Sequence, residues 1–170
     1  MKTLYLLRHA KSSWDAAAMS DFDRPLNERG RRTAPFVGEM MLKNGIAPDA
    51  LVCSPAVRAA ETAIAVRQAA NLTAEIVFDR RIYEADLPTL LQIVAELDER
   101  SASAMLVGHN PGLENLLEFL TGDAPAMPTA GLATIVSDAA TWREFILRKG
   151  SLRAFLRPKD ELKKLAENPG

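Results

Sequence analysis

Two histidines and two arginines of this sequence stand where their side chains could meet. Arg8 and His9 come directly after an apolar run, and His109 lies two residues after another such run. Arg58 lies five residues after a third run. The planar guanidinium of arginine binds phosphate oxygens in pairs, and an uncharged imidazole is a nucleophile. These residue types therefore favour a site that binds a phosphoryl group and transfers it.

The two imidazoles suit different parts of that reaction. A phosphoryl group in transfer carries negative charge on its equatorial oxygens, so cations and hydrogen-bond donors around it stabilise the transition state. We expect His9 to be the nucleophile, because neighbouring cations lower the proton affinity of an imidazole. His109 would then donate a hydrogen bond to a phosphoryl oxygen. One cysteine and two widely separated histidines offer no ligand cluster, so we expect no metal and no other cofactor.

Two of the three segments also carry the signature of a helix start. Ser54 and Asn110 are good N-cap residues, and each precedes a proline suited to the first helical position. The free amides of both helices would then face the edge of the sheet and favour an anion there. Arg58, one turn into its helix, would lean back toward the same space.

Apolar runs alternate with segments of helical spacing along the chain. This alternation predicts a single three-layer α/β domain with a mainly parallel sheet and helices on both faces. Ligands bind such sheets beyond the carboxyl ends of the strands, where the residues above stand. We expect strands at 4–7, 50–53, 75–78 and 104–107, an antiparallel closing pair at 132–136 and 144–147, and helices at about 27–45, 55–71, 87–97 and 111–120.

Composition narrows the class of protein. The chain has 170 residues, 48% of them apolar and 25% charged, as is ordinary for one globular domain. A net charge of −1 argues against bulk attraction to nucleic acid or membrane. The single cysteine, Cys53, excludes an internal disulfide, and the first apolar run is too short for a signal peptide, so we expect a cytoplasmic protein. We place the domain at 1–159 and a solvated tail at 160–170.

Three motifs taken together resemble a known family. The segments 8–10, 54–63 and 108–111 read Arg-His-Ala, Ser-Pro-x-x-Arg-Ala-x-Glu-Thr-Ala and Gly-His-Asn-Pro, and they resemble the histidine phosphatase superfamily, the phosphoglycerate-mutase-like group. The short chain and the segments 24–26 and 128–130 are similar to its phosphohistidine phosphatase branch, the SixA-like proteins. The resemblance covers almost the whole chain and implies the phosphoglycerate-mutase-like fold.

The resemblance also implies roles for single residues. His9 matches the residue that becomes phosphorylated, and Arg8, Arg58 and His109 match the phosphate pocket. Glu84 stands after the third predicted strand, where many members of the superfamily carry a proton donor.

This sequence departs from the mutase-like members behind the first motif. Those members read Arg-His-Gly-Glu, whereas Ala10 and Lys11 follow the histidine here. Asp15 stands at the place of an asparagine, and an acid there would be a poor phosphate contact. The chain also lacks the length for the insertions that build a sugar-phosphate pocket in mutases. These departures count against a mutase.

Each candidate residue also has a structural interpretation. Arg8 and His9 could be polar residues that end an edge strand, and Arg58 could form an exposed ion pair with Glu61 at i,i+3. Capping explains every residue of Gly-His-Asn-Pro except the histidine. Glu84 could be a solvated loop carboxylate.

Three functions remain open at this stage. The branch resemblance favours hydrolysis of phosphohistidine on a protein, and imidazole leaves so readily that this reaction tolerates a weak or missing general acid. A phosphatase acting on small phosphoesters would need Glu84 or an equivalent to protonate the departing oxygen. The third possibility is a phosphate-binding adaptor without activity. A basic group near the C-terminus is expected to be a solvated strand face, with an acidic partner protein as the alternative: Arg148, Lys149, Arg153, Arg157 and Lys159.

Overall fold

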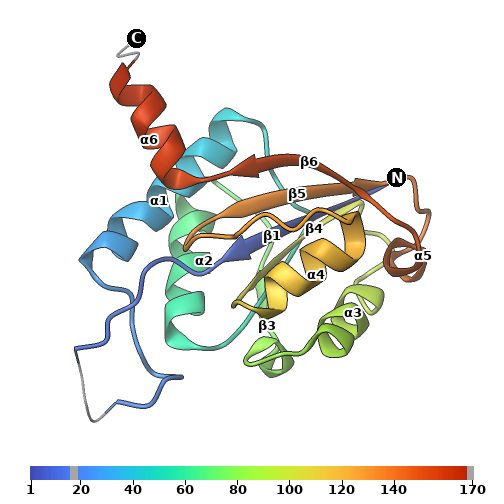
Figure 1. The fold of residues 1–170 in the computed structure, drawn as a ribbon, viewed down its shortest axis with the longest axis horizontal. Helices are drawn as coiled ribbons and strands as arrows, with labels where there is room; N and C mark the ends of the chain where they lie inside the picture. Colours follow the sequence, from blue (N-terminus) through green and yellow to red (C-terminus); the bar gives the residue numbers. More distant parts are fainter. Residues whose placement is uncertain (16–18, 168–170) are drawn as a thin grey trace.

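One sheet at the centre of the molecule places the predicted strands side by side. The computed structural model describes residues 1–15 and 19–167 of the chain. Within them, six strands form a sheet in the order β3-β2-β4-β1-β5-β6 (Figure 1). The first four strands run parallel, and β5 runs antiparallel to its neighbours β1 and β6. The strands are β1 (Lys2–Arg8), β2 (Ala50–Cys53), β3 (Ile76–Phe78), β4 (Ser103–Gly108), β5 (Leu132–Ser137) and β6 (Ser151–Leu156).

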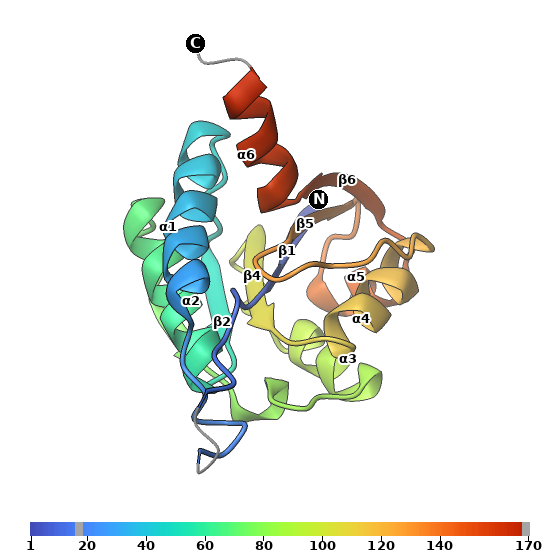
Figure 2. The same cartoon turned by 60° about the vertical axis from the view of Figure 1, so that its left-hand side comes forward.

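Helices cover both faces of this sheet, which confirms the predicted fold class. α1 and α2 lie on one face, and α3, α4 and α5 lie on the other (Figures 1 and 2). Among the helices that the structure describes, none has the length and apolar character needed to cross a bilayer. The helices are α1 (Glu28–Lys43), α2 (Val57–Ala69), the short 3₁₀ helix η1 (Arg80–Ile82), α3 (Leu87–Ala95), α4 (Gly112–Thr121), α5 (Trp142–Leu147) and α6 (Pro158–Glu167).

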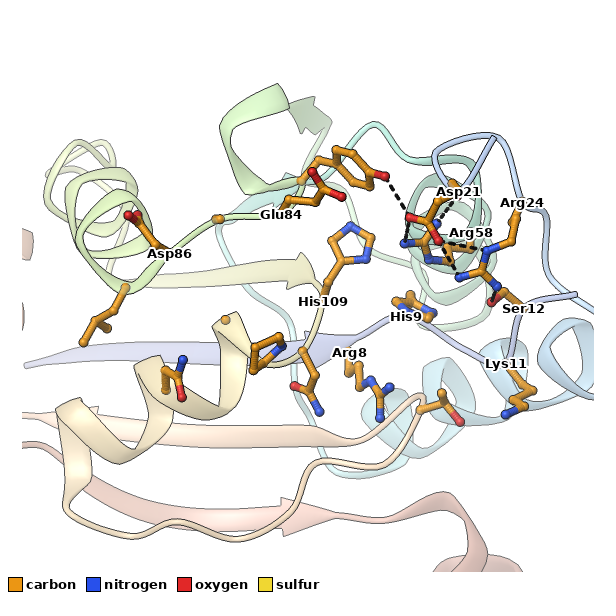
Figure 3. Close-up of a pocket in the computed structure, with 18 of the residues that line it drawn as sticks. Arg8, His9, Lys11, Ser12, Asp21, Arg24, Arg58, Glu84, Asp86 and His109 are labelled. Carbon is orange, nitrogen blue, oxygen red and sulfur yellow. Dashed lines mark hydrogen bonds and ion pairs between the residues drawn. The ribbon is translucent and has the colours of Figure 1, made fainter. Parts of the chain in front are cut away.

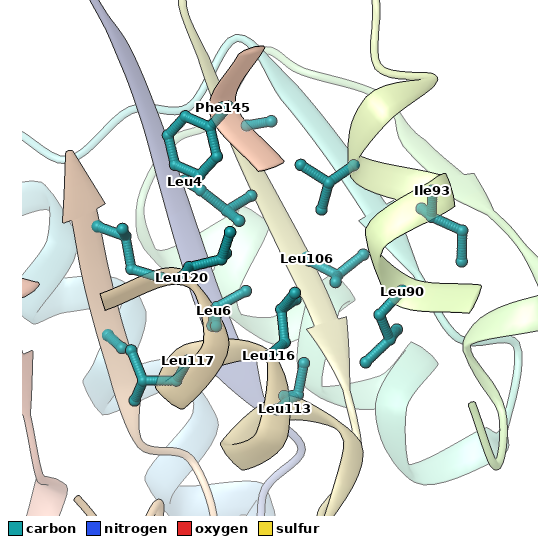
Figure 4. Packing of buried hydrophobic residues seen from close by; sticks show 14 of the residues in the cluster. Leu4, Leu6, Leu90, Ile93, Leu106, Leu113, Leu116, Leu117, Leu120 and Phe145 are labelled. Carbon is teal, nitrogen blue, oxygen red and sulfur yellow. The ribbon is translucent and has the colours of Figure 1, made fainter. Parts of the chain in front are cut away.

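The central strand β1 connects two apolar cores. Leu4 and Leu6 point to the side of α3 and α4, whereas Leu7 points to the side of α1 and α2, and all three are fully buried (Figure 4). Neighbouring side chains point to opposite faces of the sheet because a strand has a two-residue period. Because β1 lies between β4 and β5, Arg8 and His9 do not end an edge strand, and that structural interpretation is excluded.

The end of the chain differs from the prediction in two ways. Residues 144–147, expected as a strand, belong to the helix α5, and the antiparallel partner of β5 is β6. Thr141 caps α5 by accepting a hydrogen bond from the amide of Glu144, and Trp142 and Phe145 bury one helical face at i,i+3 spacing. Residues 160–167 of the expected tail belong to the helix α6 (Pro158–Glu167), most of whose side chains are exposed, and residues 168–170 lie outside the described residues.

Candidate active site

The sheet brings the four candidate residues to one edge. β1 and β4 are parallel neighbours in which Arg8 pairs with Gly108, so His9 and His109 follow at the same level. Their ring centroids lie 5.2 Å apart. Together with Arg58 from α2, these side chains line a cavity of about 680 Å³ (Figure 3). The predicted convergence is therefore confirmed.

His9 has one ring nitrogen engaged and one available. The ring is 8% exposed, and its Nδ1 lies 2.7 Å from the carbonyl oxygen of Ala10, to which it donates. The proton on Nδ1 leaves the lone pair of Nε2 for attack. Burial lowers the pKa of His9 to about 3, and His109 and the two arginines act in the same direction, against the opposing effect of the bond to Ala10. The ring is thus an uncharged nucleophile near neutral pH.

His109 has the complementary arrangement. Its Nε2 lies 2.8 Å from the hydroxyl oxygen of Ser54, and that oxygen accepts from the amide of Ala56. The Ser54 hydroxyl has two acceptor lone pairs and one proton, so it can donate to Nε2 of the neutral ring or accept from it. Nδ1 is buried and has no hydrogen-bond partner among the described residues. Burial, followed by the charge of Arg58, lowers the pKa of His109 to about 4, so the ring offers one neutral N–H donor.

The two arginines are held in place by backbone oxygens. Arg8 donates from Nη1 to the carbonyl of Met127 at 2.9 Å. Arg58, 5% exposed, donates from Nη1 to the carbonyl of Asp21 at 2.6 Å and from Nη2 to the Asp21 carboxylate at 3.1 Å. The proposed pair between Arg58 and Glu61 is not formed, because the Glu61 carboxylate accepts from the amide of Leu26 at 2.7 Å.

Asp21 is a site residue that sequence reasoning missed. Its carboxylate accepts from Arg58, from Arg24 and from the hydroxyl of Tyr83, the last at 2.7 Å (Figure 3). The hydrogen bond from Tyr83 is the main reason that the pKa of Asp21 falls to about 2. The segment 21–31 carries charges of both signs, and this local pattern gives no sign that Asp21 bridges Arg58 and Tyr83.

The expected helix caps are wrong. The N-cap of α2 is Ala56, and the Ser54 hydroxyl closes a short turn before the helix. The amide of Val57 donates to the carbonyl of Phe22, so the first amide of α2 is engaged inside the protein. The N-cap of α4 is Pro111, and the Asn110 side chain donates instead to Glu114 and to the carbonyl of Met127. Long-range partners compete successfully with local capping at both places.

Three further residues have simple positions. Glu84 is exposed and lines the cavity on the side of His109, with its backbone in the left-handed region at φ 54° (Figure 3). Asp15 accepts from Ser13 and does not line the cavity. Cys53 is buried, and its burial raises the pKa of the thiol. Among residues 1–15 and 19–167, no three His, Cys, Asp or Glu side chains are grouped so as to hold a metal ion.

Comparisons with known proteins agree with this geometry. The model of the histidine phosphatase superfamily (branch 1) matches residues 4–120. The crystal structure of a candidate phosphohistidine phosphatase SixA from Agrobacterium tumefaciens is 34% identical, with a TM-score of 0.81 over 92% of this chain and 98% of that one. The protein histidine phosphatase SixA complexed with tungstate shares the fold at 21% identity, with a TM-score of 0.81 over 94% of this chain and 99% of that one. An uncharacterized protein of Mycobacterium tuberculosis (strain H37Rv) is 30% identical over 140 residues, which are 76% of this chain and 85% of the relative.

Proposed function

The chain belongs to the histidine phosphatase superfamily, and we propose that it hydrolyses phosphohistidine on a protein through a phosphorylated His9. One observation carries the proposal. An uncharged imidazole with Nε2 free stands 5.2 Å from a second imidazole, in a cavity that also holds Arg8 and Arg58. This is the arrangement that in-line transfer of a phosphoryl group to nitrogen requires.

The first step forms the phosphorylated enzyme. Nε2 of His9 attacks phosphorus, the bond between phosphorus and the substrate nitrogen breaks, and the departing imidazole takes a proton. Arg8, Arg58 and the ring N–H of His109 stabilise the charge on the phosphoryl oxygens. The carbonyl of Ala10 stabilises the positive ring of phosphorylated His9, because it still accepts from Nδ1.

Water completes the reaction. It attacks the phosphoryl group on His9, the bond from phosphorus to Nε2 breaks, and inorganic phosphate leaves with the oxygen of that water. The positive charge of the phosphorylated ring makes His9 a good leaving group, so this step needs little acid catalysis. We propose that no metal ion takes part.

Two arguments support a phosphohistidine substrate over a phosphoester. The imidazole of phosphohistidine leaves without strong acid catalysis, so its hydrolysis does not depend on Glu84, the candidate general acid, which is an exposed carboxylate at the edge of the cavity. The relative at 34% identity over 92% of this chain is itself described as a candidate phosphohistidine phosphatase.

A panel assay tests the proposal. A phosphorylated histidine phosphotransfer domain, phosphoimidazole and an alkyl phosphate are each incubated with the protein, with and without a chelator. We expect rapid release of phosphate from the first two substrates, no effect of the chelator, acid-labile label on His9 in a single turnover, and none of this in His9→Ala. Hydrolysis of the alkyl phosphate alone would refute the substrate class, and bound phosphate without any label would indicate an adaptor.

Glu84 separates the two enzymatic possibilities. Glu84→Gln should leave the hydrolysis of phosphoimidazole unchanged. If the same variant loses activity on an alkyl phosphate that the wild type hydrolyses well, Glu84 is a general acid and the enzyme is a phosphomonoesterase.

A further inference from the structure

A second cavity lies beside the phosphate cavity and shares two of its lining residues. Lys11 and Thr129 line both cavities, and the second has a volume of about 260 Å³. Lys11 stands on the side of the phosphate cavity away from Glu84 (Figure 3). Beyond Lys11, the second cavity is lined by the first turns of α1 and α6 and by the loop before β5.

Positive charge dominates the second cavity. Lys11, Arg29, Arg157 and Lys159 line it, against a single carboxylate, Asp160. Among the described residues, none of these four cations lies within 4.0 Å of a carboxylate oxygen. Exposed arginines elsewhere differ in this respect: Arg32, Arg81 and Arg100 have carboxylate partners, whereas Arg31, Arg143 and Arg153 have none among the described residues. The distinguishing feature is therefore the clustering: four cations without carboxylate partners lie around one hollow, and one of them, Arg157, stacks on Phe155. Such a cluster favours an anionic ligand.

The hollow continues away from the phosphate cavity between two helices. A third cavity of about 390 Å³ shares Arg29, Thr33 and Leu162 with the second, and it also contacts Phe36. α6 lies beside α1 along this path (Figure 2). The three cavities are thus neighbours in a row that leads from the His9 side along α1, and we call this row the groove. Its outermost cavity is lined by the apolar Phe36 and Leu162 as well as by Arg29 and Arg32. A groove of this length suits an extended segment of chain better than a small molecule.

We propose that this groove binds an acidic segment of the protein substrate next to its phosphorylated histidine. Carboxylates of the segment would pair with Lys11, Arg29, Arg157 and Lys159, and its aliphatic side chains would contact Leu162. The inference rests on the proposed function and names the class of protein that the site accepts. It also revises the view of the C-terminal basic group, because Arg157 and Lys159 separate from the other three residues and join the active-site side of the molecule.

Matched peptides test the groove. Two peptides carry one phosphohistidine, flanked on both sides either by Asp and Glu or by Asn and Gln. The kcat/KM for each peptide is measured with the wild type and with the groove variants Arg157→Glu and Lys159→Glu. The control is Arg153→Glu, which changes an exposed arginine of β6 outside the groove. We expect the wild type to prefer the acidic peptide about 10-fold and both groove variants to lose that preference. The control should keep it, and all four proteins should hydrolyse phosphoimidazole equally.

Two results would overturn the inference. Equal hydrolysis of both peptides by the wild type would exclude an acidic determinant, and an equal loss in Arg153→Glu would indicate bulk charge rather than the groove. Binding of the unphosphorylated acidic peptide, followed by fluorescence anisotropy, separates this inference from the proposed function. Charge-dependent binding at Arg157 without hydrolysis would refute the function alone, whereas hydrolysis without preference would refute the groove alone.

Discussion

The low pKa of His9 is the physical basis of the proposed nucleophile, and it is directly measurable. With the pKa near 3, the ring is about 99% neutral at pH 5, whereas a histidine with an ordinary pKa of 6.5 is about 3% neutral there. The cause is burial, since the ring is 8% exposed, reinforced by His109 and the two arginines. Between pH 8 and pH 5, the charge of His9 should therefore not change.

Nuclear magnetic resonance of the ring carbons and protons tests this expectation. The chain has two histidines, so a His9→Gln variant assigns both signals without further labelling. We expect neither signal to show a titration midpoint above pH 5 in the protein without ligand. A midpoint near 6.5 for His9 would refute the reasoning, because a ring that is half protonated near neutral pH is not held neutral by the fold.

The free energy of unfolding should depend on pH because of the same lowered pKa of His9. Because the pKa of His9 is lower in the folded chain than in the unfolded one, the unfolded chain binds more protons below pH 6.5, and the free energy of unfolding falls as the pH falls. From pH 7 to pH 5 the loss due to His9 is about 2 kcal/mol. Urea unfolding at both pH values should show that His9→Gln loses less stability than the wild type by this amount. An equal loss in the two proteins would contradict the shift.

Three other substitutions test the positions of side chains. Ser54→Ala removes the hydrogen bond to the His109 ring, and we expect kcat on phosphoimidazole to fall about 2- to 12-fold, as the loss of about 0.5–1.5 kcal/mol predicts. Asp21→Ala removes the carboxylate that accepts from Nη2 of Arg58 but keeps the backbone carbonyl that accepts from Nη1, so kcat/KM should fall about 10-fold, while Asp21→Asn, which keeps a side-chain acceptor, should lose less. Gly30→Ala places a Cβ against a backbone carbonyl of the loop that follows β1, and urea unfolding should show a loss of about 1–3 kcal/mol with kcat on phosphoimidazole nearly unchanged.

The strands and the convergence of the site were predictable for the same reason. Apolar runs fix the buried strands, and parallel strands end at a common edge, so His9 and His109 had to meet once β1 and β4 were neighbours. The cap of α1 was equally local, since Asn27 accepts from the amide of Gly30 as predicted. Signals within a few residues are sufficient where no distant partner competes.

Distant partners explain what the sequence did not predict. The Asn110 side chain donates to the carbonyl of Met127, and its oxygen caps no amide of α4. Asp21 bridges Arg58 and Tyr83, which are 37 and 62 residues away. No local pattern encodes these contacts of Asn110 and Asp21. The strand predicted at 144–147 failed for a different reason, because a short apolar run fits both periods and the cap at Thr141 decided for the helix.

The motif at 54–63 contributes to more than phosphate binding. Ser54 contacts Nε2 of the second imidazole, Arg58 lines the cavity, and Thr62 contacts the residue that follows the first imidazole. Thr62 donates to the carbonyl of Arg58 at 2.7 Å and accepts from the amide of Ala10 at 3.0 Å. That contact holds the amide of Ala10, the residue whose carbonyl receives the His9 proton, while Glu61 anchors the loop before α1. The segment 54–63 therefore contacts both imidazole environments, through Ser54 ahead of α2 and through Thr62 within it, so the spacing of this motif is set by the positions of the two rings as much as by the phosphate between them.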